Sequence, residues 1–262
     1  MSGRANAGAD WLAPDWRIAG VGALMTTRSG GVGRGPYASM NISAAVGDDA
    51  DCVAANRARL AAVMGARPVF LNQVHGARAV RIGVVDAAAG APIHEADAAV
   101  TTEPGIACVV QAADCLPVLL AAPGGRAVGA AHAGWRGLAA GVVRAAVEAV
   151  CAVGSCRPGE IVAWLGPCIG PAAFEVGADV LLAFGASPTA AAAPAAVRFR
   201  LQGGAKWRAD LAGLARDQLG HAGVSQVSGG SWCTVADGSR FFSFRRDRVT
   251  GRMAAAVWIT GR

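Results

Sequence analysis

Three short segments of the sequence each carry one residue that can bind a metal ion, beside a residue that bends or ends a strand. The segments are Asn72-Gln-Val-His-Gly, Ala113-Asp-Cys-Leu-Pro and Ala131-His-Ala-Gly-Trp-Arg-Gly, which supply His75, Cys115 and His132. Two imidazoles and one thiolate suit a divalent zinc ion, because nitrogen and sulfur donors match its borderline softness. Three protein ligands leave the fourth tetrahedral position for water or substrate, so these residue types predict a catalytic metal site.

The spacing of these residues carries less information than their types. Ligands of a structural zinc site usually lie a few residues apart, whereas much longer stretches separate His75, Cys115 and His132. The residues alone therefore leave a second interpretation open. In it, His75 is a turn histidine bonded to the backbone, Cys115 is an inert buried thiol and His132 is packed in the core.

The hydrophobic pattern predicts mixed strands and helices, which is an α+β or mixed α/β fold. Apolar and β-branched runs predict strands at Val69–Leu71, Ala79–Val85, Ile106–Gln111, Val118–Ala122, Ala127–Ala131, Ile161–Leu165 and Met253–Ile259. Helical periodicity predicts helices over Asp49–Met64, with Asp48 or Asp49 as its cap, Gly137–Val153 and Ala209–His221. On this map all three ligands lie at strand ends, where side chains distant in sequence can converge on one pocket.

The composition predicts one domain over residues 1–262. The chain is 53% hydrophobic, which is enough to fill a core, and its composition shows no abrupt change or repeat. Residues 1–16 are expected to form a peripheral N-terminal segment, and the alanine- and proline-rich stretch Ala186–Ala196 is expected to be a loop.

The same composition argues against several functional classes. The most apolar stretch, Ile106–Ala122, contains Gln111, Asp114 and Pro117, so it is predicted to form buried strands and not to cross a membrane. Seven cysteines without a secretion signal indicate reduced thiols and a cytoplasmic protein.

The formal charge of +6 comes from scattered arginines, which gives no support for nucleic-acid binding. The densest basic group is Arg240, Arg245, Arg246 and Arg248, interleaved with phenylalanines and Asp247. A basic pocket for an anionic small molecule fits this group.

Further ordered motifs surround the three ligand segments. Upstream lie Thr26-Thr-Arg-Ser-Gly-Gly, Gly35-Pro-Tyr-Ala-Ser-Met-Asn and Gly47-Asp-Asp with Asn56-Arg57. Downstream lie Gly166-Pro-Cys-Ile-Gly, Trp232-Cys-Thr, Phe241-Phe-Ser-Phe-Arg-Arg-Asp and Thr250-Gly-Arg. Over nearly the whole chain this order resembles the YfiH family, also called the laccase-domain or multicopper polyphenol oxidase family. The sequence departs from the family pattern at two places, neither of which is a ligand. It has Asn41-Ile-Ser where the family usually has Asn-Leu-Gly, and Ser231 stands before Trp-Cys-Thr.

The resemblance implies a function and a fold. It places His75, Cys115 and His132 on the family's metal ligands and implies zinc-dependent purine nucleoside phosphorolysis, with adenosine deamination alongside. Adenosine, inosine or methylthioadenosine would react with phosphate to give the base and ribose 1-phosphate. The implied fold is an α/β/β/α sandwich similar to the catalytic domain of cytotoxic necrotizing factor. For the oligomeric state, both a monomer and a small homo-oligomer are expected possibilities.

The family's oxidase name implies copper chemistry, but the number of histidines argues against a full multicopper site. The chain has only four histidines, His75, His94, His132 and His221, too few for a further cluster of three coppers. A weaker copper-dependent oxidation at the same open site stays an alternative, since copper binds such ligands more tightly than zinc does.

Other residues receive hypothetical roles. Asp114, beside Cys115, is either a proton shuttle or a structural acceptor. Arg57 is a candidate phosphate ligand because its planar fork makes bidentate bonds, with Asn41 lining the same pocket, although a surface salt bridge would explain Arg57 as well. Asp97 is expected to cap or brace a loop.

Two further hypotheses come from other classes of protein. In the first, a metal-free cysteine hydrolase uses Cys115 as nucleophile and His132 as base. His75 distinguishes it from the metal hypothesis, since nucleophilic catalysis does not need a second histidine on the sulfur. In the second, the chain is a metal-stabilised binding module, for which the sequence offers no repeat or long amphipathic seam.

Overall fold

The structure, a computed structural model, describes residues 10–187 and 194–261. Residues 1–9 of the expected peripheral segment and 188–193 of the expected loop lie outside the described residues. The strands are β1 Val21–Met25, β2 Arg67–Val69, β3 Ala79–Arg81, β4 Ala98–Thr101, β5 Ile106–Ala112, β6 Leu116–Ala121, β7 Val128–Ala133, β8 Val162–Leu165, β9 Glu175–Val176, β10 Phe199–Gly203, β11 Lys206–Ala209, β12 Gln226–Gly229 and β13 Met253–Ile259. The α-helices are α1 Ala50–Met64, α2 Trp135–Ala139, α3 Val142–Gly154, α4 Ala178–Ala183, α5 Leu211–His221 and α6 Phe244–Asp247.

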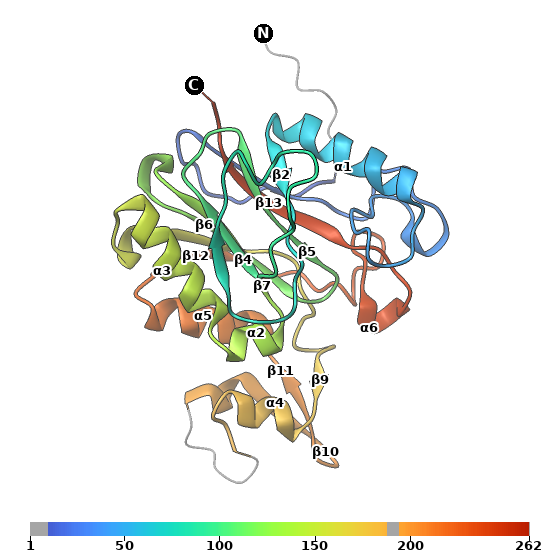
Figure 1. Ribbon diagram of the computed structural model, residues 1–262. Helices are drawn as coiled ribbons and strands as arrows, with labels where there is room; N and C mark the ends of the chain where they lie inside the picture. Colours follow the sequence, from blue (N-terminus) through green and yellow to red (C-terminus); the bar gives the residue numbers. More distant parts are fainter. Residues whose placement is uncertain (1–9, 188–193, 262) are drawn as a thin grey trace.

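Two sheets pack face to face at the centre of the molecule (Figure 1). One has the strand order β1-β13-β5-β2 and the other β12-β8-β6-β7-β4-β3, and both mix parallel and antiparallel pairs. Successive side chains of a strand point to opposite faces. In β5, Cys108 and Val110 therefore enter the core between the sheets, while Ala107 and Val109 pack on the outer face.

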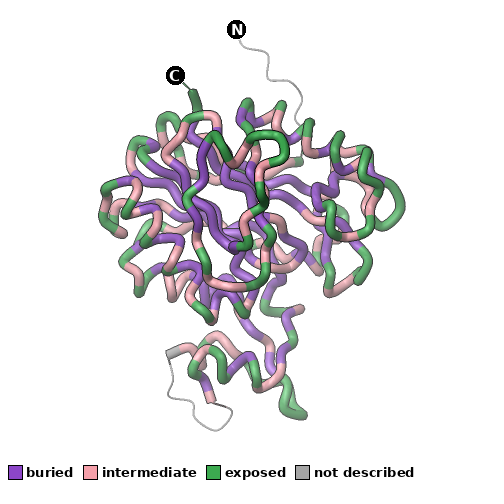
Figure 2. Tube along the Cα trace, viewed as in Figure 1, coloured by how far each residue is buried: buried purple, intermediate pink, exposed green. Residues whose placement is uncertain are grey.

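Helices cover both outer faces of this pair of sheets. Leu60 and Met64 of α1 pack on the outer face of the four-stranded sheet. On the six-stranded sheet, α3 and α5 bury apolar residues such as Val147 and Leu214 in one cluster with Val118. Figure 2 shows the buried chain concentrated in the central strands. This α/β/β/α order of layers confirms the predicted mixed fold, and the likeness to cytotoxic necrotizing factor stays a prediction.

The helix boundaries follow from local chemistry. The Asp49 carboxylate accepts a hydrogen bond from the backbone N–H of Cys52 at 2.9 Å, which confirms the predicted cap of α1. The single helix predicted over Gly137–Val153 is instead two helices. Gly141, with φ of 94°, separates α2 from α3 because a left-handed residue cannot continue a right-handed helix.

A small projection extends from the main body at the bottom of Figure 1. It contains α4 and the antiparallel sheet β10-β11-β9. Hydrophobic periodicity did not predict these elements, because their strands are short and β10 is largely exposed. Among the described residues, no helix has the length and apolar character needed to span a membrane.

Candidate metal centre

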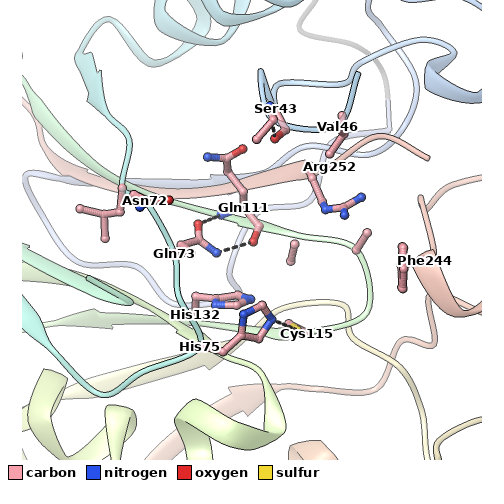
Figure 3. Close-up of a pocket in the computed structure, with 14 residues that line it drawn as sticks. Ser43, Val46, Asn72, Gln73, His75, Gln111, Cys115, His132, Phe244 and Arg252 are labelled. Carbon is pink, nitrogen blue, oxygen red and sulfur yellow. Dashed lines mark hydrogen bonds between the residues drawn. The ribbon is translucent and has the colours of Figure 1, made fainter. Parts of the chain in front are cut away.

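The fold brings His75, Cys115 and His132 together. His75 lies in the loop after β2, Cys115 directly precedes β6, and His132 lies in β7. Their candidate ligand atoms all lie within 4.8 Å of one another, and Cys115 Sγ is 3.8 Å from His75 Nε2. The two imidazole rings meet edge to face, with centroids 4.9 Å apart (Figure 3). Side chains separated in sequence thus form one cluster.

A buried carboxylate, Asp97, organises two of the three ligands. Antiparallel pairing of Ala98 with Ala131 places Asp97 opposite His132, and Asp97 Oδ1 lies 2.8 Å from His132 Nδ1. This contact leaves Nε2 of His132 as the ring nitrogen that can serve the cluster. The same carboxylate accepts the backbone N–H groups of residues 74, 75 and 76. Asp97 therefore braces the His75 loop and also orients His132, and the second role has no signature in the sequence.

The site residues have unusual backbone conformations. His75 and Asp114 have φ of 61° and 94°, in the left-handed region that residues with a β-carbon seldom adopt. Such conformations persist where surrounding contacts impose them, often at functional sites. The hydrogen bond that the backbone N–H of His75 donates to Asp97 supplies that constraint at His75.

Two glycines of the Ala131–Gly137 segment let this loop approach closely. A β-carbon at Gly134 would lie 2.9 Å from Cys115 Sγ and 2.9 Å from His75 Cδ2. One at Gly137 would lie 2.7 Å from the carbonyl oxygen of Gly76. Side chains at these positions would push the ligands apart, so both glycines help to define the site.

The electrostatics of the cluster favour a thiolate next to an imidazolium. Burial alone would raise the pKa of Cys115, but the charge of His132 and hydrogen bonds from both imidazoles lower it to about 6. Burial would lower the pKa of His132, but the thiolate and the Asp97 carboxylate raise it to about 9. For Asp97, burial acts to raise the pKa, and the bonds from His132 and Gly76 hold it below its usual value.

The donor set fits a soft or borderline metal ion. Nitrogen and sulfur donors suit zinc or copper, and the Asp97–His132 contact is the support that metal-binding histidines usually have. Within residues 10–187 and 194–261 the group contains no fourth histidine, cysteine or acidic donor. A metal held there would keep an open position.

A cavity of about 430 Å³ adjoins the cluster (Figure 3). His75, Cys115 and His132 form one side, and Ser43 and Arg252 lie across from them. Other lining residues include Asn72, Gln73, Gln111 and Phe244. Gln73 donates to the Gln111 carbonyl at 2.9 Å and accepts from its N–H at 2.7 Å, which fixes both residues. Residue types alone gave Asn72, Gln73 and Gln111 no role, although Asn72 and Gln73 lie inside a ligand motif.

A smaller hollow of about 260 Å³ touches the same cluster. It shares His75, Ala113, Cys115 and Phe244 with the larger cavity. Asp114 lines it, and its carboxylate accepts hydrogen bonds from the Thr234 hydroxyl and, at 2.6 Å, from the Arg245 N–H. Both carboxylate oxygens are therefore engaged.

Asn41 and Arg57 lie behind the cavity wall. Buried Asn41 donates to the Ser43 carbonyl at 3.1 Å and accepts from the Arg252 N–H at 2.8 Å. Half-buried Arg57 donates to the Ile42 carbonyl at 2.8 Å, and its guanidinium lies 4.1 Å from the Phe70 ring centroid. Neither residue is among those lining the two hollows. Asn41 positions lining residues, whereas Arg57 packs against the protein itself.

Comparison with known proteins places this site in a family. Residues 22–260 match the family described as multi-copper polyphenol oxidoreductase laccase. The chain is 46% identical over 250 residues to the purine nucleoside phosphorylase PA4543 of Pseudomonas aeruginosa, covering 95% of this chain and 98% of that one. It is 44% identical over 253 residues to the purine nucleoside phosphorylase YfiH of Escherichia coli, covering 95% and 98%.

Solved structures agree with this assignment. The Neisseria meningitidis protein NMB0706 superposes with a TM-score of 0.87 at 44% identity, covering 96% of this chain and 99% of that one. YlmD from Geobacillus stearothermophilus superposes with a TM-score of 0.88 at 33% identity, covering 98% of each chain. The family match and these full-length similarities show that the chain belongs to the YfiH family of laccase-like proteins.

Proposed function

We propose that this protein is a metal-dependent purine nucleoside phosphorylase. The observation that carries the proposal is the His75–Cys115–His132 cluster in the wall of a cavity of about 430 Å³, a size typical of small-molecule sites. The names of the Pseudomonas and Escherichia relatives support the reaction class. The expected substrates are adenosine, inosine or methylthioadenosine with phosphate, and the products are the free base and ribose 1-phosphate.

Different residues would bind the metal, bind the nucleoside and position these binding residues. His75, Cys115 and His132 would hold zinc, with copper as the alternative metal, and Asp97 keeps His132 in place. A metal ion bound there would supply Lewis acidity. The amides of Gln73 and Gln111 and the guanidinium of Arg252 offer polar groups to a nucleoside. Asn41 acts through Ser43 and Arg252 as a positioning residue.

Adenosine deamination is the second activity proposed for the same centre. It replaces the amino group at C6 with oxygen from water and therefore needs a proton carrier. Asp114 is the candidate shuttle because it lines the smaller hollow beside Cys115. Its bonds to Thr234 and Arg245 also fit a structural acceptor, and Asp114→Asn separates the two roles. A shuttle predicts slower deamination at unchanged stability, and a structural acceptor predicts a lower melting temperature.

Product analysis tests the proposed function directly. The purified protein is incubated with adenosine, with and without phosphate, and the products are separated by chromatography. Adenine that appears only with phosphate supports phosphorolysis, and inosine formed without phosphate supports deamination. Cys115→Ala should remove both products, while Cys151→Ala, a matched change outside the site, should retain them. Wild-type protein with full metal occupancy and no product would refute the proposal.

A metal-free cysteine hydrolase is the second candidate, and one observation favours it. Cys115, His132 and Asp97 stand in the order nucleophile, base and orienting carboxylate. Two measurements separate the two functions. The first is metal analysis of protein purified without added metal, and the second is iodoacetamide labelling of Cys115 before and after chelation. Stoichiometric metal and labelling only after chelation support the phosphorylase. A reactive thiol in active, metal-free protein supports the hydrolase.

A further inference from the structure

The smaller hollow has a different chemical character from the larger cavity. Three arginines, Arg136, Arg245 and Arg248, line it together with one carboxylate, Asp114. Counting only the arginine and carboxylate side chains, three positive charges against one negative charge leave an excess of two. In the larger cavity the single arginine, Arg252, already donates to the carbonyls of residues 250 and 251.

The guanidinium groups of the hollow are held mainly by aromatic rings. Arg136 lies 4.4 Å from the centroid of Trp135, and Arg248 lies 5.8 Å from that of Phe244. In the part of the chain that the structure describes, neither the Arg136 nor the Arg248 guanidinium donates to a carboxylate or a carbonyl oxygen. Stacking leaves the N–H edges of a guanidinium free, and these edges match the oxygens of a phosphate.

The other charged groups of the hollow do not occupy those donors. Both oxygens of Asp114 accept bonds from Thr234 and from the Arg245 backbone. The Arg245 side chain donates to the Glu175 carbonyl at 3.2 Å and lies 5.7 Å from the Phe174 centroid. The excess positive charge therefore belongs chiefly to Arg136 and Arg248.

We propose that the smaller hollow is the subsite for inorganic phosphate, and that the larger cavity takes the nucleoside. This inference rests on the proposed phosphorolysis and assigns its two substrates to separate compartments. The compartments share His75, Ala113, Cys115 and Phe244, so molecules bound in them meet at the cluster. The amide-rich larger cavity suits a neutral nucleoside, and the arginine-rich hollow suits a dianion.

The reaction balances with these two substrates alone. An oxygen of hydrogen phosphate bonds to C1′ of the ribose while the bond from C1′ to the purine nitrogen breaks. The electron pair of that bond stays with the purine, which gains the proton that the phosphate loses. Arg136 and Arg248 hold the phosphate during the step, and no oxidant or reductant takes part.

Steady-state kinetics of arginine variants test the assignment. Arg136→Ala, Arg248→Ala and the double variant are compared with Arg144→Ala, which removes an exposed arginine of α3 outside both compartments. The double variant should raise the phosphate KM about 10- to 100-fold, as expected for lost charge-assisted hydrogen bonds, with the nucleoside KM within about twofold of wild type. An unchanged phosphate KM in a folded, active double variant would overturn the phosphate subsite and leave phosphorolysis standing.

Phosphate binding without turnover keeps this inference separate from the proposed function. Trp135 lines the hollow, so its fluorescence should change saturably with phosphate and not with chloride of equal ionic strength. The chain has seven tryptophans, and Trp135→Phe identifies the contribution of this one. Arginine-dependent binding in a protein that cleaves no nucleoside would refute phosphorolysis and retain the subsite.

A nucleotide is the other source of a phosphate group. If adenosine 5′-monophosphate displaces phosphate and binds more tightly than adenosine in wild type, but not in the double variant, the hollow takes a 5′-phosphate. That result would overturn the assignment to inorganic phosphate. Equal affinities for adenosine and adenosine 5′-monophosphate, with phosphate displacing neither of them, support it.

Discussion

Two regions of the molecule hold a free thiol in contrasting surroundings. Cys108 lies in β5, in the apolar core between the sheets, and burial raises its pKa above the usual value for a thiol. Cys115 lies at the start of β6, and two imidazoles lower its pKa to about 6 against the effect of burial. Burial alone makes a cysteine inert, and neighbouring positive charge makes it a ligand or nucleophile.

The contrast also separates the stabilising core between the two sheets from the functional site at the strand ends. Between the sheets, alternating apolar side chains exclude water and stabilise the fold. At the strand ends, loops bring polar groups together because the sheet no longer satisfies the backbone there. Substitutions on the two sides of this comparison should therefore have different effects.

Replacing Cys115 should have the largest effect. Cys115→Ala removes the only sulfur donor of the cluster, so we expect loss of bound metal. Activity should fall by more than about 100-fold, because losing a residue that only supports a metal ligand already costs up to about that much. Metal analysis and product assays measure both effects. Cys108→Ala should retain metal and activity, and a Cys115→Ala protein with full metal content would contradict the assigned ligand set.

Removing the charge of Asp97 should weaken both the site and the fold. Asp97→Asn should lower metal affinity about 10- to 100-fold. It should also reduce the free energy of unfolding by about 3 kcal/mol, since a buried ion pair loses one partner. Metal titration and urea denaturation measure these two quantities, and an unchanged metal affinity would show that His132 does not need this carboxylate.

The stability effect of Asp97 should depend on pH. The folded protein holds the pKa of Asp97 below its unfolded value, so the stabilising contribution is complete above the unfolded pKa and is lost as the pH falls through the folded one. The stability difference between wild type and Asp97→Asn should therefore shrink on acidification. A difference that stays constant into strongly acidic solution would contradict this expectation.

The two thiols should also differ in their reaction with iodoacetamide. In chelator-treated folded protein, labelling of Cys115 should rise as the pH passes through about 6, because the thiolate is the nucleophile. Cys108 should stay unlabelled until the protein unfolds. Mass spectrometry of labelled peptides at a series of pH values measures both, and a Cys115 profile centred near the usual thiol pKa would remove the contrast.

A side chain at Gly134 should disturb the centre geometrically. The added methyl group of Gly134→Ala would lie 2.9 Å from Cys115 Sγ, so the ligands must shift, and we expect an activity loss of roughly tenfold to a hundredfold. Gly220→Ala in α5, where nothing lies within 4 Å of the added group, is the matched control. Equal activity of the two variants would show that the cluster tolerates displacement.

The smallest effect on activity is expected at Arg57. The sequence-based hypothesis predicts a raised phosphate KM for Arg57→Ala, whereas the contacts with Ile42 and Phe70 predict a loss of about 1 kcal/mol of stability and an unchanged KM. Phosphate titration of activity and thermal unfolding distinguish these outcomes. A raised KM at normal stability would return Arg57 to the phosphate site.

Much of the fold could be predicted from the hydrophobic pattern. The predicted strand Met253–Ile259 is β13 with the same bounds, and the run Ile106–Gln111 is one residue shorter than β5. The strand predicted at Val69–Leu71 is displaced, since β2 is Arg67–Val69. Strands β1, β4 and β12 were missed because short apolar runs carry little periodicity.

The sequence by itself determined the kind of chemistry: two imidazoles, one thiol, too few histidines for a copper cluster, and motifs of the YfiH family. Only the tertiary structure decided that Asp97 supports His132, that Arg57 faces the protein, and that Arg252 faces the cavity. The physical reason is that residue type sets the available donors and charges. Strand register and loop conformation set which of them lie within a few ångströms of one another.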